Sequence, residues 1–299
     1  MTYDEFSMFA DNAADAGLDR TSDPTVRRVD TVVEGLVVST LVWGESPPEL
    51  VLLHGGAQNA HTWDTVALAL DRPLIAIDLP GHGHSDWRPK QDYLPQVLSN
   101  EVADVVATLA PTADAVIGMS MGGLTAVCLA ADRPELVRRL GVVDVTPGTD
   151  HEKAEPIVSF VDGPEFFESF EAILERTIEH NPTRSESSLR RGILHNAREL
   201  DDGRWSWRYD PMRGWKSEGG EMPDFGDLWD KVAAVVAPID LWQGGAWSVV
   251  SDEDVERFRS LQPEVRHTVV ADAGHSIQGD QPLRLCELIE DLLSRPVSQ

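Results

Sequence analysis

Cysteine and long apolar runs are scarce in this sequence, and each shortage narrows the class of protein. Two cysteines among 299 residues are too few for a disulfide framework, so Cys128 and Cys286 are expected to be small core residues in a reducing compartment. No apolar run is long enough to span a bilayer, and the opening M-T-Y-D-E-F-S-M-F-A-D has no basic region followed by an apolar one. We therefore expect a cytoplasmic protein with no membrane partner.

Basic residues are about half as numerous as acidic ones. The sequence holds 25 Lys and Arg against 51 Asp and Glu, which gives a formal net charge of −26 at pH 7. A charge of this sign repels nucleic acid, so we expect no nucleic-acid partner. The hydrophobic fraction of 41% is ordinary for a globular protein, and the length allows one large domain, or a domain with an insertion, to bury a full core.

The most informative stretch is A-V-I-G-M-S-M-G-G-L-T-A-V-C-L-A-A, at residues 115–131. Its apolar start predicts a buried strand and its end predicts a helix, so the chain turns at the G-x-S-x-G pattern between them. Such a turn holds Ser120 in a strained conformation that exposes its hydroxyl, and Gly118 and Gly122 flank it because a Cβ there would collide with neighbouring elements. Ser120 is therefore predicted to be a nucleophile. The alternative is an ordinary glycine-rich turn, in which the G-x-S-x-G pattern occurs by chance.

Another buried strand, E-L-V-L-L-H-G-G, ends in two glycines. Glycine after a strand lets a backbone N–H approach a ligand closely, and the helix after Ser120 points its free N–H groups at the serine. Gly56 and Met121 are therefore predicted to donate the two hydrogen bonds of an oxyanion hole. An ordinary turn is the alternative at Gly56.

The loop G-H-G-H-S-D, after the apolar strand P-L-I-A-I-D-L-P, raises a metal hypothesis. His82, His84 and Asp86 have the H-x-H-x-D spacing of a binuclear metal site, and imidazole and carboxylate ligands suit zinc. The further histidine expected next is missing, because Trp87 occupies its position. We interpret the three residues as parts of a polar loop, and we expect no metal and no cofactor.

Four motifs in this order, L-L-H-G-G, D-L-P-G-H-G-H-S-D, G-M-S-M-G-G and D-A-G-H-S-I, resemble the α/β-hydrolase superfamily. The resemblance implies an α/β fold with an eight-stranded, mostly parallel sheet flanked by helices. It also implies a serine nucleophile after the fifth strand, a histidine after the last strand and a helical cap inserted after the sixth. His275 matches that histidine, and a neutral imidazole there would act as general base for Ser120.

Regular alternation of strand and helix stops after R-R-L-G-V-V-D-V-T-P, the expected sixth strand. Residues 147–226 contain helical patches and an aromatic run, and we expect them to form the cap between two parts of the hydrolase core, 1–146 and 227–299. Tryptophans in this segment are expected either to line an apolar substrate pocket or to form a core within the cap. The candidates for substrate contact are Trp205, Trp207 and Trp215.

The acidic partner of His275 departs from the common family pattern. Most relatives carry an aspartate just after the seventh strand, where this sequence has Trp247 and Ser248. The acids in S-D-E-D, at 251–254, are typical of a helix N-cap and first turn. Asp144 stands at the end of the sixth strand, from which a subset of the family takes its acid, and we predict that it orients His275. A strand-end aspartate with a purely structural hydrogen bond is the alternative.

Together these residues predict a serine hydrolase that cleaves carboxylic esters of small, partly apolar substrates through an acyl-enzyme intermediate. A serine nucleophile argues against epoxide or haloalkane chemistry, which needs a carboxylate nucleophile. A lactonase, a carbon–carbon bond hydrolase and a perhydrolase use the same triad and stay open, as does a non-catalytic ligand-binding relative. We expect a small-molecule substrate and a monomer or homodimer.

Overall fold

An eight-stranded sheet runs through the middle of the molecule in the order β1-β2-β4-β3-β5-β6-β10-β11. The computed structural model describes residues 3–19, 23–148, 151–181, 184–211 and 224–297. The β1–β2 and β2–β4 pairs are antiparallel and all other neighbours are parallel. The strands are β1 (Val26–Val33), β2 (Leu36–Trp43), β3 (Leu50–Leu53), β4 (Leu74–Ile77), β5 (Ala115–Met119), β6 (Leu140–Val143), β10 (Ile239–Gly244) and β11 (Arg266–Val270).

Both faces of the central strands are buried, which explains their continuous apolar sequences. In β3, Val51 and Leu53 pack into the core on one face of the sheet, whereas Leu50 and Leu52 pack into the core on the other face. This alternation follows from the two-residue period of a strand. The expected α/β fold with a mostly parallel, eight-stranded sheet is confirmed.

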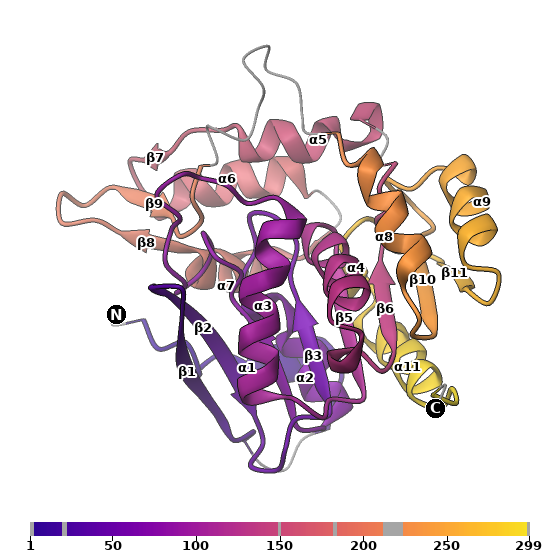
Figure 1. The fold of residues 1–299 in the computed structure, drawn as a ribbon. Coiled ribbons are helices and arrows are strands. Elements are labelled where there is room, and N and C mark those ends of the chain that lie inside the picture. The colour runs from indigo at the N-terminus through magenta and orange to yellow at the C-terminus, as the bar shows by residue number, and fades with distance from the viewer. Residues whose placement is uncertain (1–2, 20–22, 149–150, 182–183, 212–223, 298–299) are drawn as a thin grey trace.

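Helices cover the two faces of the sheet (Figure 1). The core on the face of Val51 and Leu53 contains side chains from α3, α4, α8 and α9. The core on the face of Leu50 and Leu52 contains side chains from α1, α2 and α11. The helical segments of this part of the chain are α1 (Phe9–Asp15), η1 (Ala60–Trp63), α2 (Asp64–Leu70), α3 (Pro95–Leu109), α4 (Met121–Asp132), η2 (Pro134–Leu136), η3 (Gly226–Leu228), α8 (Trp229–Ala234), α9 (Asp252–Leu261), α10 (Ile277–Asp280) and α11 (Pro282–Leu293).

The segment of residues 147–226 follows β6 and is called here the insertion; its described part lies across one end of the sheet (Figure 1). Besides helices it contains a small antiparallel sheet in the order β7-β9-β8, which the sequence reading did not predict. Its described part has its own apolar cluster, which includes Phe167, Ile173 and Trp207. The elements are α5 (His151–Val161), β7 (Phe166–Phe167), α6 (Phe170–His180), α7 (Glu186–Asn196), β8 (Ala197–Glu199) and β9 (Trp205–Trp207).

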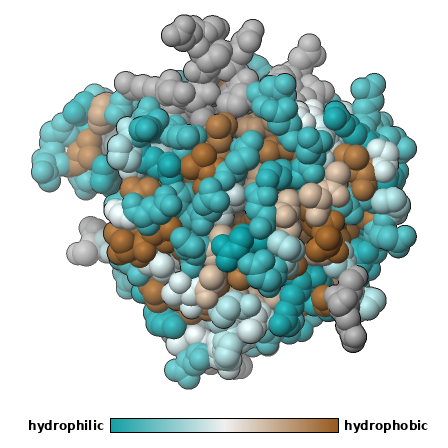
Figure 2. Space-filling model, in the orientation of Figure 1, coloured by the Kyte–Doolittle hydropathy of each residue, from teal (hydrophilic) through white to brown (hydrophobic). Residues whose placement is uncertain are grey.

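The surface carries hydrophilic residues over most of the face drawn in Figure 2, with separate hydrophobic patches between them. The most exposed large apolar side chains among the described residues are those of Val32, in β1, and Val236, between α8 and β10. Isolated apolar side chains of this kind are ordinary on a protein surface. Among the described residues, no helix combines the length and the apolar character needed to span a membrane.

Candidate active site

Ser120 occupies a sharp turn between β5 and α4. Its backbone has φ 52° and ψ −121°, a conformation that non-glycine residues rarely adopt. The flanking glycines are required by close approach, because a Cβ on Gly118 would lie 2.2 Å from the carbonyl oxygen of Gly122, and a Cβ on Gly122 would lie 2.4 Å from that of His54. The geometry that the nucleophile assignment requires is therefore present: a strained serine that begins a helix.

His275 and Asp144 meet although 131 residues separate them in sequence. His275 lies in the loop between β11 and α10, and Asp144 follows the last residue of β6 with φ 48°. The Nδ1 atom of His275 lies 2.8 Å from Oδ2 of Asp144, and the carboxylate is fully buried. This contact fixes the ring so that Nε2 is the nitrogen left for other partners.

Asp144 also accepts hydrogen bonds from the loop after β10. Its Oδ1 accepts from the Gly244 N–H at 2.7 Å and from the Ser248 hydroxyl at 2.5 Å, and its Oδ2 accepts from the Val249 N–H at 3.4 Å. These donors stabilise a carboxylate that has no access to water. Ser248 stands where most family members carry the acid, and here its hydroxyl donates to the carboxylate of Asp144.

Trp247 was also not predicted to belong to the site. Its ring meets the ring of His275 edge-on, with centroids 5.8 Å apart, and it lines the same cavity. The sequence offered one indication that Trp247 could belong to the site: Trp247 and Ser248 occupy the positions at which most relatives carry the aspartate. An aromatic edge against the imidazole restricts how that ring can move.

Gly56 and Met121 both line the cavity that Ser120 lines. Within the described part of the chain, neither the N–H of Gly56 nor that of Met121 donates a hydrogen bond to a protein acceptor. Gly56 follows β3 and Met121 is the first residue of α4, so both groups lie at the carboxyl end of the parallel strands. Two free donors at this edge are what an oxyanion hole needs, and the assignment of the two residues stays a prediction.

Two buried histidines hold the loop that carries Gly56. The Nδ1–H of His54 donates to the Gly55 carbonyl at 2.7 Å, and Nε2 of His82 accepts from the Ala57 N–H at 3.1 Å. Burial lowers the pKa of both rings, that of His82 to about 3, so both are neutral near pH 7. The peptide groups on either side of Gly56 are therefore both anchored.

Two of the three H-x-H-x-D side chains, those of His82 and Asp86, contact backbone groups, whereas Nδ1 of His84 lies 3.7 Å from the Glu5 carboxylate. His82 uses both ring nitrogens, since its Nδ1–H donates to the Pro80 carbonyl, and the Asp86 carboxylate accepts from the Val37 N–H at 2.8 Å. Their polar atoms therefore point to different partners, as expected for a structural loop. The structure gives the motif a second role that the sequence reading missed, because His82 supports the loop that carries Gly56.

A different group of possible metal ligands, His61, Asp64 and His195, lies together among the buried residues. The two imidazole rings stack nearly parallel, with centroids 3.8 Å apart and 13° between their planes. The nitrogen lone pairs of an imidazole lie in the plane of the ring, so those of two stacked rings lie in separate, nearly parallel planes. In this arrangement a single ion cannot lie about 2.0 Å from a nitrogen of each ring and in line with both lone pairs. We assign no metal to this cluster.

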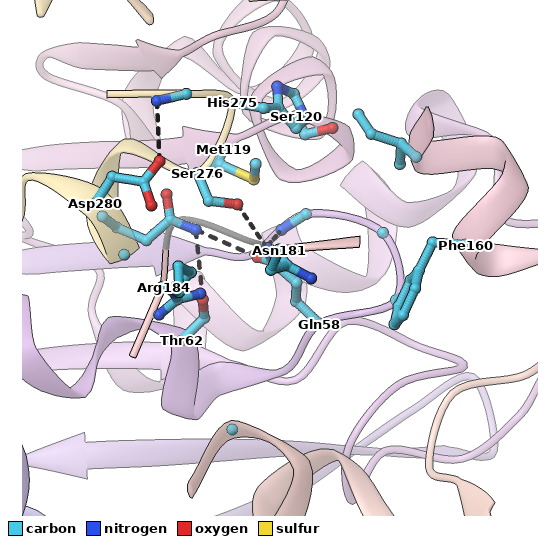
Figure 3. Close-up of a pocket in the computed structure, with 18 of the residues that line it drawn as sticks. Gln58, Thr62, Met119, Ser120, Phe160, Asn181, Arg184, His275, Ser276 and Asp280 are labelled. Carbon is cyan, nitrogen blue, oxygen red and sulfur yellow. Dashed lines mark hydrogen bonds between the residues drawn. The ribbon is translucent and has the colours of Figure 1, made fainter. Parts of the chain in front are cut away.

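A cavity of about 1290 Å³ opens between the insertion and the carboxyl ends of the strands (Figure 3). Ser120 and His275 both line it, together with Gly56, Met121 and Trp207. No hydrogen bond joins the Ser120 hydroxyl to His275 among the described residues, where the side-chain partner of the His275 ring is Asp144. The cavity is large enough for a small ester.

The three candidate tryptophans have different positions. Trp207 lines the cavity, whereas Trp205 packs on Phe170 within the insertion and does not line it. The two residues share one face of β9, and two steps along a strand place Trp205 about 7 Å from Trp207. Substrate contact by these tryptophans stays a prediction, and Trp215 lies outside the described residues.

Comparisons with known proteins place this geometry in a family. A sequence model of the Alpha/beta hydrolase family matches residues 50–288. The chain is 45% identical to Esterase Rv0045c of Mycobacterium tuberculosis over 97% of this chain and 96% of that protein. A solved structure of that esterase covers 99% of this chain and is itself covered completely, with a TM-score of 0.87 and 44% identity.

A more distant solved structure, that of E-2-(acetamidomethylene)succinate hydrolase, has the same fold. Its TM-score is 0.79 at 22% identity, and the match covers 91% of this chain and 100% of that one. The family model and the esterase match both extend over most of this chain. The chain belongs to the alpha/beta hydrolase family.

Proposed function

We propose that this protein is a serine hydrolase that cleaves carboxylic esters of small, partly apolar substrates. The observation that carries the proposal is the 2.8 Å contact of Asp144 with His275, whose side chain lines the same cavity as Ser120 in its strained turn. The full-length similarity to a protein named as an esterase supports ester cleavage in particular. The triad is Ser120, His275 and Asp144.

In the first half of the reaction, Ser120 Oγ attacks the ester carbonyl carbon while Nε2 of His275 takes the hydroxyl proton. The negative oxygen that forms is stabilised by the N–H groups of Gly56 and Met121. When the carbon–oxygen bond to the alcohol breaks, His275 returns the proton to the leaving oxygen, and an acyl-enzyme remains. Asp144 holds the tautomer and stabilises the imidazolium.

In the second half, water replaces the alcohol and the same groups act in the same order. His275 takes a proton from water as its oxygen attacks the acyl carbon, and then returns that proton to Ser120 as the acid product leaves. No charge has to leave the site during the cycle. The same machinery would open a lactone, cleave a suitable carbon–carbon bond or form a peracid, so these reactions are the alternatives.

The insertion would act as the cap of this site. We infer a hydrolase core of residues 1–146 and 227–299 with a cap at residues 147–226, because the described part of the insertion contributes one wall of the cavity. Trp207 would contact substrate from that wall. We further propose a cytoplasmic protein, monomeric or homodimeric, with no nucleic-acid partner, in keeping with its net charge of −26.

The decisive test combines labelling with turnover. A fluorophosphonate should label Ser120, and Ser120→Ala should lose both the label and the hydrolysis of nitrophenyl esters. A panel of acyl chain lengths beside one lactone would rank the alternatives. If the alanine variant turns esters over at the rate of the wild type, the nucleophile assignment is wrong; if the wild type is neither labelled nor active on any probe, the non-catalytic alternative holds.

A further inference from the structure

Arg184 extends from the insertion into the cavity wall, on the loop between α6 and α7 (Figure 3). Its guanidinium lies flat against the backbone of α10, because a Cβ on Gly279 would be 3.0 Å from Cζ and from Nη2. Its Nη2 donates one hydrogen bond, to the Ser188 hydroxyl at 3.1 Å. The arginine therefore has a defined position between the insertion and the loop that carries His275.

The charge of Arg184 has no carboxylate partner within 4.0 Å in the described part of the chain. The other arginine of the cavity wall, Arg191, forms an ion pair with Asp15. A guanidinium carries five N–H donors and stays protonated in proteins, so Arg184 has donors that its one neutral partner does not use.

Asp280 is the acid that acts on Arg184 through space. Its Oδ2 accepts the Gly274 N–H at 2.9 Å, which commits that oxygen to the loop before His275. Burial lowers the pKa of Arg184, and the field of Asp280 raises it. Asp280 therefore offsets part of the positive charge without occupying the donors of the guanidinium.

We propose that Arg184 is a recognition site for an anionic group, most suitably a carboxylate, on the substrate. The proposal rests on the proposed ester hydrolysis and names its substrate class: esters that carry a second, negatively charged group. A planar guanidinium binds a carboxylate through two parallel hydrogen bonds, and a site of low polarity strengthens them. The cavity, at about 1290 Å³, has room for an ester group at Ser120 and a second group at Arg184.

The test compares esters that differ only in one charge. For an anion on the acyl side, the probes are mono-nitrophenyl glutarate and its neutral glutaramide analogue. For an anion on the alcohol side, they are acetoxybenzoate and acetoxybenzamide. In at least one pair, the wild type should favour the charged ester by about 10- to 100-fold in kcat/KM, the range expected for hydrogen bonds to a charged group.

The variants locate that preference. Arg184→Gln should lower the charged-to-neutral ratio of kcat/KM toward one, mainly through a higher KM for the charged ester, and Arg184→Lys should keep part of it. Arg190→Gln is the matched control, because Arg190 lies on α7 and pairs with Glu186 at 2.9 Å. It should keep the ratio of the wild type. Raising the salt concentration should also reduce the preference of the wild type, a measurement that needs no variant.

Two results would overturn the proposal. Equal kcat/KM for the charged and neutral esters of both pairs in the wild type would show that the cavity does not select an anion. A preference that survives in Arg184→Gln would place the anion site elsewhere. In both cases the neutral esters are still cleaved, which separates this failure from failure of the ester hydrolysis itself, where no probe is turned over.

Discussion

Asp144 acts on His275 as one member of a buried hydrogen-bonded group. Its carboxylate faces an N–H of Gly244, a hydroxyl of Ser248 and the imidazole, and it has no contact with solvent. A buried carboxylate of this kind keeps both its charge and its direction only while those donors remain in place. The proposed role of Asp144 therefore depends on the loop after β10.

Asp144→Asn is expected to lower kcat by as much as about 10⁴, because an amide at this position favours the wrong imidazole tautomer. The measurement is kcat on a nitrophenyl ester, together with a thermal melt that shows the variant is folded at the assay temperature. Asp252→Asn is the control, since Asp252 lies in the first turn of α9 and should change stability by no more than about 1 kcal/mol. Normal turnover in Asp144→Asn would disprove the assignment of the acid.

Ser248→Ala removes the shortest of the bonds to Asp144, that from the hydroxyl at 2.5 Å. We expect kcat to fall on the order of tenfold while KM changes little, because the hydroxyl touches the carboxylate and not the substrate; tenfold corresponds to about 1.4 kcal/mol. Ser248→Thr keeps a hydroxyl and should restore much of the rate. A drop in the threonine variant equal to that in alanine would point to packing instead of the hydrogen bond.

Ser120 and His275 could be proposed from the sequence because each lies in a motif whose neighbours specify its conformation. At Gly118 the close approach that requires glycine comes from the turn itself, and at Gly122 it comes from the carbonyl groups of Leu53 and His54 at the end of β3. Ser248 and Arg184 could not be found in this way. Their importance depends on contacts with residues 104 and 95 positions away, respectively, which only the folded topology brings together.

At the scale of elements, the N-terminal segment connects the core to the insertion. The Tyr3 hydroxyl lies 2.7 Å from Nδ1 of His195 at the end of α7, and in α1 the Asn12 side chain accepts from Arg191 of α7 at 2.8 Å. A third link comes from Glu5, whose carboxylate pairs with His61 of η1 at 3.1 Å. This segment therefore fixes α7, and with it one wall of the cavity.

His61 makes this connection dependent on pH. Burial alone would lower its pKa, but the carboxylates of Asp64 and Glu5 outweigh burial and raise the pKa of His61 to about 9. Since the unfolded pKa is about 6.5, the protonated ring stabilises the fold fully below pH 6.5. That contribution is lost as the pH rises from 6.5 through about 9.

The free energy of unfolding should therefore fall by a few kcal/mol between pH 6.5 and about 9.5, since each unit of pKa difference corresponds to about 1.4 kcal/mol. Urea denaturation across this range measures it. His61→Gln should flatten the decline and lower stability near pH 7, because Asp64 loses its buried partner. His267→Gln, on β11, should keep the slope of the wild type. A wild-type stability that is constant over the range would contradict this account.

Which elements could be predicted depends on how local their signals are. The helix α9 begins at Ser251 with the expected N-cap, and Asp254 completes a capping box within the same turn. The small sheet of the insertion has strands of two or three residues, too short to show the alternating pattern by which a strand is recognised. Strands this short form because they pair with adjacent strands, as β7 and β8 do with β9.

At the scale of the whole molecule, the strand order explains why Asp144, at the end of β6, can contact His275, which follows β11. The sheet places β6 beside β10 and β10 beside β11, so the carboxyl ends of all three meet at one edge. The sequence predicted this edge through the family resemblance. It could not predict how the insertion covers the edge, because that depends on contacts such as those between α1 and α7.

The net charge of −26 leads to the last prediction. A chain with twice as many acids as bases repels itself when folded, and this repulsion acts over about 30 Å at 0.01 M salt but only about 8 to 10 Å near 0.1 to 0.15 M. Surface ion pairs such as Arg72–Glu290 stabilise the fold, and salt weakens them, but exposed pairs each contribute only about 0 to 1 kcal/mol. Screening should therefore remove more repulsion than attraction.

The melting temperature should accordingly rise by a few degrees between 10 and 150 mM NaCl, at about 2 to 4 °C for each kcal/mol. Differential scanning calorimetry in a buffer of low ionic strength measures it, and KCl at the same ionic strength should give the same shift, because screening depends on ionic strength and not on the cation. A melting temperature that falls with salt would mean that ion pairs such as Arg28–Asp78, at 2.8 Å and largely buried, dominate the electrostatic free energy of this fold.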